Sequence, residues 1–246
     1  MTAPTRRIPR VGAFFDMDKT LLAENSGAVY VRHRYESGEI DGFELVRSAL
    51  VYLQYKVGLL DIRAWTRAQV AQFAGLSEAE ILRDAREVMR RVARTVYPEA
   101  MEAVRWHQAQ GHLVAIVSGS TRYIVEPIAE QLGVEHTLYT RLEVVDGRLT
   151  GRVIEPICFE EGKIYWLREL VEAEGVDLAK SWFYTDSITD LPLLELVGHP
   201  VVTNPDPRIY REARRRRWPI RFFQPPASVA AADAEEPTPA PGEALG

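Results

Sequence analysis

Short apolar runs that alternate with helical patterns constrain the fold of this chain more than any other feature. The runs cover residues 11–15, 113–117, 181–185 and 200–203, with a shorter candidate at residues 137–139. Each run is too short for a helix and is bounded by polar or turn-forming residues, which is typical of a buried strand. Helical patterns lie between them, over residues 98–110, 121–132 and 162–174, and Gly133 and Gly175 predict the ends of the last two. This order predicts an α/β fold, a Rossmann-like parallel sheet with helices on both faces.

Two segments interrupt the alternation. The first has no convincing strand and predicts helices over residues 26–37, 42–57, 61–74 and 77–96. Ser77, followed by Glu80, predicts a capping box at the start of the last of them. The second segment spans residues 141–153, where an Asp-Gly pair between alternating residues predicts a β-hairpin. We therefore expect a core built from residues 10–23 and 98–223, with an all-helical cap, residues 24–97, inserted after the first strand.

Charge is distributed unevenly along the 246 residues. The net charge of −5 argues against a general nucleic-acid binder. Residues 224–246 hold four acids, no base and five of the fifteen prolines, which predicts a disordered tail. Just before this tail, residues 208–221 contain seven arginines. The run of Arg214, Arg215, Arg216 and Arg217 is either a solvated helix end or a surface for weak contact with an anionic partner.

The single cysteine, Cys158, excludes an internal disulfide and a cysteine-built zinc site. No apolar run is long enough to span a membrane or to act as the core of a signal peptide. These features predict a soluble cytoplasmic protein.

The first predicted strand is followed directly by Asp16, Asp18 and Thr20. The carboxyl ends of parallel strands are where α/β sheets bind ligands. Two carboxylates so close together repel each other, and a divalent cation between them would remove that cost. The pair therefore suggests a Mg²⁺ site, although two solvated loop acids would give the same pattern.

Further polar residues follow the other predicted strands. Ser118 and Gly119 end the second strand with a hydroxyl and backbone N–H groups that suit a phosphate. Lys163 opens a helix, and Asp186 and Asp190 follow the third strand. Each of these also fits an ordinary helix cap or a surface residue. Their shared position at one edge of the predicted sheet is what predicts a common site.

The order of these features resembles the haloacid dehalogenase superfamily of hydrolases, in its phosphoserine-phosphatase-like subfamily. The matching segments are FFDMDKTLL at residues 14–22, IVSGS at 116–120, EGK at 161–163 and YTDSITDLP at 184–192. The helical insert after the first motif resembles the cap domain of that subfamily. The resemblance covers about residues 10–210 and implies a phosphatase.

The resemblance also implies a role for each motif residue. Asp16 would attack phosphorus and form an aspartyl-phosphate, and Asp18 would act as general acid and then as general base. Lys163 would neutralise developing charge and restrain Asp16. The implied Mg²⁺ site consists of the Asp16 carboxylate, the Asp18 backbone carbonyl and Asp186. Asp190 would lie next to these ligands and support them. The phosphoryl group would be held by Ser118 and the Gly119 N–H, in a loop oriented by Thr20.

Departures from the subfamily leave the substrate open. In phosphoserine phosphatases, a Glu nine residues after the nucleophile binds the amino group of the substrate, but this chain has Asn25 at that position. In that subfamily an arginine of the cap binds the carboxylate of the serine substrate, and Arg63 and Arg67 are both candidates for this role. A small phosphorylated metabolite is expected, either phosphoserine or another monoester such as phosphocholine, phosphoethanolamine or histidinol phosphate. A regulatory protein that binds a phosphorylated ligand, and phosphotransfer to an alcohol, are the alternatives to hydrolysis.

Overall fold

The computed structural model describes residues 9–38, 41–42, 50–51, 54, 61–227 and 229. The predicted helix over residues 42–57 and the predicted tail over residues 224–246 therefore lie largely outside the described residues. Within the described part, no helix is long and apolar enough to cross a membrane.

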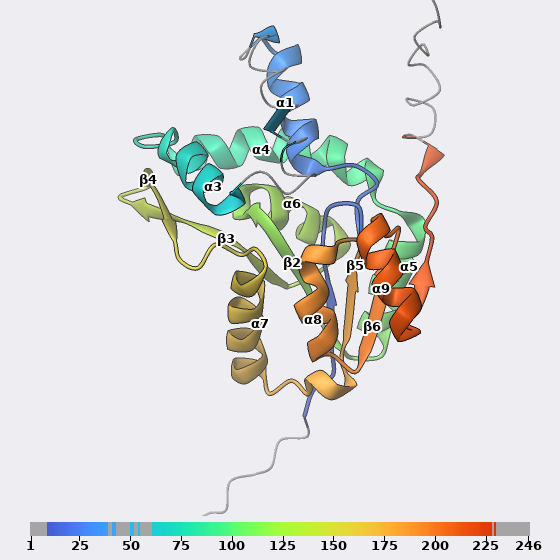
Figure 1. Ribbon diagram of the computed structural model, residues 1–246. Helices are drawn as coiled ribbons and strands as arrows, with labels where there is room; N and C mark the ends of the chain where they lie inside the picture. The colour runs from blue at the N-terminus through green and yellow to red at the C-terminus, as the bar shows by residue number, and fades with distance from the viewer. Residues whose placement is uncertain are drawn as a thin grey trace, which may run out of the picture.

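A seven-stranded sheet in the order β4-β3-β2-β1-β5-β6-β7 forms the centre of the molecule (Figure 1). All neighbouring strands are parallel except β3 and β4, which form an antiparallel hairpin. The strands are β1 (Gly12–Phe15), β2 (Leu113–Thr121), β3 (His136–Val145), β4 (Arg148–Ile154), β5 (Trp182–Thr185), β6 (His199–Thr203) and β7 (Ile220–Arg221). The predicted fold class is confirmed.

Helices cover both faces of this sheet. One layer contains α5 (Pro98–Ala109) and α6 (Arg122–Leu132), and the other contains α7 (Glu161–Glu174), α8 (Leu191–Leu196) and α9 (Pro207–Arg216). Neighbouring residues of β1 point to opposite layers, because Phe14 packs with the α7 side and Phe15 with the α5 side. Burial on both faces explains why the strands are continuous apolar runs. The predicted helix stops at Gly133 and Gly175 are both left-handed residues.

Three helices lie beyond the end of the sheet toward which the parallel strands point (Figure 1). They are α1 (Ser26–Glu36), α3 (Ile62–Ala71) and α4 (Glu78–Val92), and a short 3₁₀ turn, η1 (Ala93–Thr95), follows α4. The β3–β4 hairpin joins this layer to the sheet, since the Gly75 N–H donates to the Leu149 carbonyl at 2.8 Å. No strand is found among the described residues of the segment 25–97, as the sequence predicts.

The predicted capping box at Ser77 is wrong. Ser77 has the extended backbone of an N-cap residue, but its side chain makes no capping hydrogen bond. The hairpin takes over part of this role, because the Glu78 N–H donates to the Gly147 carbonyl at 3.0 Å. The short strand predicted at residues 137–139 is also longer than expected. It extends to Val145 because its second half leaves the parallel sheet and pairs with β4.

Candidate active site

Lys163, in the first turn of α7, reaches two carboxylates at the carboxyl end of the sheet. Its Nζ lies 2.7 Å from Asp16 Oδ1 and 2.8 Å from Asp190 Oδ2. Asp16 follows β1 directly, and Asp190 ends the short 3₁₀ turn after β5. The exposed fractions are only 4% for Lys163, 8% for Asp16 and 2% for Asp190. A buried ammonium group with two buried carboxylate partners is the electrostatic centre of the site.

Burial and charge act in opposite directions on this cluster. Burial raises the pKa of Asp16 to about 7, against the opposing attraction of Lys163. Burial alone would lower the pKa of Lys163, but the Asp16 and Asp190 carboxylates outweigh it and hold that pKa above its ordinary value. Lys163 is therefore a permanent cation, and positive charge beyond that of Lys163 would favour the ionised form of Asp16.

Asp18 connects the first motif to the helical layer above it. The Ser26 N–H, at the start of α1, donates to Asp18 Oδ1 at 2.7 Å. Burial raises the pKa of Asp18, despite this hydrogen bond. Thr20 is also buried, and within the described part of the chain its hydroxyl has no hydrogen-bond partner.

Ser118 and Gly119 lie at the end of β2, where the strand continues to Thr121 before α6 begins. The Ser118 side chain is buried, and the Ser120 N–H donates to its Oγ at 3.2 Å. A hydroxyl and backbone N–H groups thus meet where a strand leads into a helix, an arrangement that suits an anion.

The loop after β5 is held by short side-chain bonds. The Thr185 hydroxyl donates to Asp190 Oδ2 at 2.8 Å and accepts from the Ser187 N–H at 3.1 Å. The Asp186 carbonyl accepts from the Asp206 N–H at 2.8 Å. Among the described residues, Asp190 Oδ1 is buried without a hydrogen-bond partner. The loop thereby places Asp186 and Asp190 on the same sheet edge as Asp16.

The residues present are compatible with Mg²⁺. The described residues contain no group of three or more His, Cys, Asp or Glu side chains gathered to hold a metal ion. The expected set needs only two carboxylates, Asp16 and Asp186, and the carbonyl of Asp18. All of its donors are oxygen atoms, which Mg²⁺ prefers, and two of them belong to carboxylates that carry the negative charge a divalent cation needs. Asp190, also expected near the metal, is already engaged by Lys163 and Thr185.

The candidate cap residues have partners within the chain. The Asn25 side chain accepts from the Ala28 N–H at 3.0 Å and so caps α1. Arg63 pairs with Glu161 and, at 3.4 Å, with Glu160. The Arg67 Nε lies 2.8 Å from Glu155 Oε1. Both candidate arginines therefore contact the segment that leads to Lys163.

Two other sequence features lie outside this site. Arg215 and Arg216 pair with Glu212, and Arg216 also pairs with Glu195, whereas Arg214 and Arg217 are exposed. Cys158 is buried, and burial raises the pKa of its thiol to about 12. The thiol is thus neutral at physiological pH.

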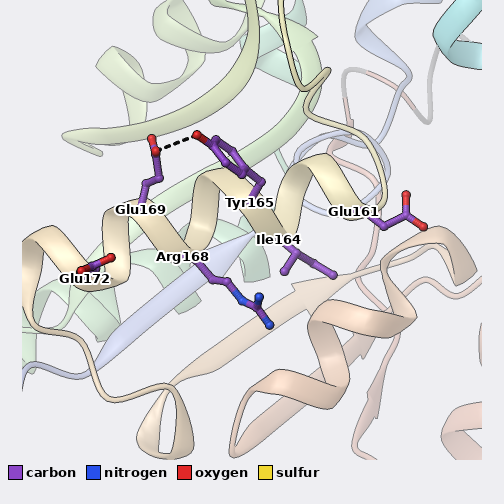
Figure 2. Close-up of a pocket in the computed structure, with 6 residues that line it drawn as sticks. All are labelled: Glu161, Ile164, Tyr165, Arg168, Glu169 and Glu172. Atoms are coloured by element: carbon purple, nitrogen blue, oxygen red, sulfur yellow. Dashed lines mark hydrogen bonds between the residues drawn. The ribbon is translucent and has the colours of Figure 1, made fainter.

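A surface hollow lies along α7 (Figure 2). Its lining comes entirely from that helix, with Tyr165 donating a hydrogen bond to Glu169 at 2.9 Å. Glu161, from the third motif, lines it, but Asp16, Asp18, Lys163, Asp186 and Asp190 do not.

Sequence reasoning missed the residues that brace these loops. Thr140, in β3, and Asp206, before α9, hydrogen bond to the backbone of the second and fourth motifs. Asp206 could have been noticed as an N-cap before Pro207, whereas nothing local marks a threonine in mid-strand.

The fold and this constellation match a known class of proteins. The family model described as haloacid dehalogenase-like hydrolase matches residues 13–195. The chain belongs to the haloacid dehalogenase-like hydrolase family.

Three of the similar proteins are phosphatases by name. The chain is 35% identical over 232 residues to a probable phosphatase of Mycobacterium tuberculosis, covering 93% of this chain and 79% of that protein. It is 33% identical to a histidinol-phosphatase of Neisseria meningitidis, covering 86% and 98%. It is 34% identical to a phosphoserine phosphatase of Mycobacterium tuberculosis, covering 86% and 70%. The predicted family and the predicted enzyme class, a phosphatase, are confirmed.

Solved structures show the same fold. A protein of unknown function from Bordetella pertussis Tohama I superposes with a TM-score of 0.78 at 32% identity, covering 87% of this chain and 98% of that one. A phosphoserine phosphatase captured as a phospho-aspartyl intermediate analogue gives a TM-score of 0.65 at 20% identity, covering 92% and 99%. At that identity the second likeness concerns the fold alone.

Proposed function

We propose that this chain is a Mg²⁺-dependent phosphomonoester hydrolase that acts through an aspartyl-phosphate on Asp16. The observation that carries the proposal is the buried Lys163 ammonium, bound to both Asp16 and Asp190 at the carboxyl end of the sheet. Residues 10–23 and 98–223 would form the catalytic core, and residues 24–97 the cap. Residues 224–246 would be a tail without a catalytic role.

The two acids of the first motif, Asp16 and Asp18, have different roles in the proposed reaction. Asp16 attacks phosphorus in line with the leaving oxygen, and Asp18 donates a proton to that oxygen as the P–O bond breaks. Asp18 then takes a proton from the water that attacks the aspartyl-phosphate, which releases phosphate and restores Asp16. The raised pKa of Asp18 suits the first of these steps, because the group must carry a proton when substrate binds.

Charge neutralisation supports both steps. Lys163 holds the Asp16 carboxylate in place and faces the developing charge, while Ser118 and the Gly119 N–H receive phosphoryl oxygens. Asp16, the Asp18 carbonyl and Asp186 would hold Mg²⁺, with Asp190 behind them. The bound ion supplies positive charge that orients the phosphoryl group and keeps Asp16 ionised.

The two cap arginines favour one class of substrate over another. Arg63 and Arg67 are paired with core carboxylates, so a substrate carboxylate would have to displace those pairs. This favours an alcohol without a carboxylate, such as histidinol phosphate, phosphocholine or phosphoethanolamine, over phosphoserine. A histidinol-phosphatase and a phosphoserine phosphatase are about equally similar to this chain, so this order rests on the two arginine pairs.

A panel of phosphomonoesters assayed with and without Mg²⁺ tests the proposal. We expect Mg²⁺-dependent phosphate release and a loss of at least about 10³-fold in kcat for Asp16→Asn, because the amide is not a competent nucleophile. Full activity of that variant would sink the mechanism. Tight ligand binding by the wild type without turnover would instead identify a regulatory binding protein.

A further inference from the structure

Two extra residues in β2 create the loop that holds Ser118 and Gly119. In the register with β3, Val117 pairs with Leu138 and Thr121 pairs with Thr140. Four steps along β2 therefore match two steps along β3, so β2 bulges at residues 118–120. A bulge removes backbone groups from the ladder, and those groups need other partners when they are buried.

Thr140 supplies one of these partners. Its hydroxyl donates to the Gly119 carbonyl at 2.7 Å and accepts from the Cys158 N–H at 3.3 Å. Thr140 is fully buried, so no water competes for either bond. One side chain thus connects the bulge to the segment that leads into the lysine helix α7.

The peptide unit between Gly119 and Ser120 links the Thr140 hydroxyl to the Ser118 side chain. The Gly119 carbonyl and the Ser120 N–H belong to the same trans peptide and point in opposite directions. Holding the carbonyl at Thr140 therefore aims the N–H away from it, toward Ser118 Oγ at 3.2 Å. Because Ser118 Oγ accepts this bond, its own hydrogen is left to donate elsewhere.

We propose that Thr140 is a positioning residue for phosphate binding: through the Gly119–Ser120 peptide it orients the Ser118 hydroxyl as a donor to the phosphoryl group. The inference rests on the proposed function, because it takes Ser118 and Gly119 as the anion site. It adds to that function a residue on a different strand, outside the four motifs.

The test measures orthophosphate affinity by calorimetry in the presence of Mg²⁺, alongside melting temperature and kcat/KM for p-nitrophenyl phosphate. Thr140→Val keeps the shape and removes the hydroxyl. We expect orthophosphate to bind about tenfold more weakly, which corresponds to one lost buried hydrogen bond. Thr140→Ser, which keeps the hydroxyl, should restore binding.

Thr203→Val is the matched control. Thr203 is a fully buried strand residue whose hydroxyl, among the described residues, has no hydrogen-bond partner. This variant should leave orthophosphate affinity unchanged. If Thr140→Val does not fold, Thr140→Ala is compared with Thr140→Ser in the same way.

Two results would overturn the inference. One is a Thr140→Val protein that melts earlier but binds orthophosphate like the wild type, which would make the hydroxyl purely structural. The other is a wild type that does not bind orthophosphate at all, which would remove the anion site. A wild type that binds orthophosphate but hydrolyses no monoester would overturn the proposed function alone, and the affinity comparison would still decide the role of Thr140.

Discussion

At the scale of single residues, the site depends on a charge that is costly to remove. Lys163 pairs with two buried carboxylates, and its loss would leave both of them desolvated and without a counter-charge. A surface pair behaves differently because water screens it. Lys163 should therefore be important for folding as well as for catalysis.

Replacement of Lys163 by Met tests this double role. We expect the free energy of unfolding at pH 7 to fall by about 3–5 kcal/mol, as for other broken buried pairs. Turnover should fall by at least about 10²-fold, since a preorganised positive charge is lost. Urea unfolding and steady-state kinetics measure the two effects. Lys180→Met, at an exposed pair with Asp177, is the control and should change stability by less than about 1 kcal/mol. Equal stability of the two variants would contradict the argument.

His107 makes stability depend on pH. It is fully buried, with Nε2 3.0 Å from the Tyr184 hydroxyl and Nδ1 2.8 Å from Nδ1 of His112. Burial, helped by His112 and Arg221, lowers the pKa of His107 to about 3. An unfolded histidine titrates near 6.5, so between these values the unfolded chain binds a proton that the native chain does not.

Stability should therefore fall as the pH is lowered from about 6.5 toward 3, through this group. Urea midpoints between pH 7 and pH 5 measure the slope. His107→Gln, which cannot titrate, should be less stable at pH 7 but show a shallower slope below pH 6.5. Identical slopes for the variant and the wild type would show that other groups govern the pH dependence.

At the scale of elements, the β3–β4 hairpin anchors the cap to the core. Gly151, in β4, has φ +80°, and a Cβ built there would lie 2.9 Å from the Ala74 Cβ and 3.1 Å from the Ala71 carbonyl. The strand therefore touches the end of α3, the helix that carries Arg63 and Arg67. Packing at this contact holds the two arginines within reach of Glu155 and Glu161.

Gly151→Ala should destabilise the protein more than Gly175→Ala does. Both glycines have positive φ, but a Cβ at Gly175 would meet nothing within 4 Å. A positive φ strains the backbone of both variants, whereas only the Cβ at position 151 would also collide with the end of α3. We expect the difference to be about 1–3 kcal/mol, the usual cost of overpacking. Thermal or urea unfolding measures it, and equal losses in the two variants would show that the hairpin does not hold α3.

At the scale of the whole molecule, the far edge of the sheet carries a basic surface. Its exposed arginines are Arg208, Arg211, Arg214, Arg215, Arg217 and Arg221, and Phe222 beside them is 64% exposed. Glu212 neutralises part of this charge through Arg215 and Arg216. Arg214 and Arg217 therefore contribute most of the charge of the predicted 214–217 contact.

We expect weak, salt-dependent binding of the protein to vesicles that contain anionic lipid, measured by cosedimentation. Charge reversal at Arg214 and Arg217 together should weaken this binding, whereas reversal at Arg83, an exposed arginine of α4, should not. Equal binding to neutral vesicles, or unchanged binding by the double variant, would contradict a basic docking surface.

The sequence by itself determined the features that depend on neighbours along the chain. Apolar runs predicted β1, β2, β5 and β6, Gly133 and Gly175 predicted two helix ends, and the Asp-Gly pair predicted the hairpin. The two-residue strand β7 was not predicted. The order of the four motifs predicted which residues gather at the sheet edge. These predictions succeed because local backbone preferences, and burial on both faces of a parallel sheet, leave patterns within a few neighbouring residues.

Only the tertiary structure decided which distant groups bond to one another. Arg63 and Arg67 pair with carboxylates about ninety residues away. The backbone of the hairpin, and not the Ser77 side chain, accepts a hydrogen bond at the start of α4. The Thr140 hydroxyl donates to the Gly119 carbonyl. Such partners are set by packing between elements and by the need to satisfy buried polar groups. Local sequence patterns do not encode them, because each group has many equally suitable partners along the chain.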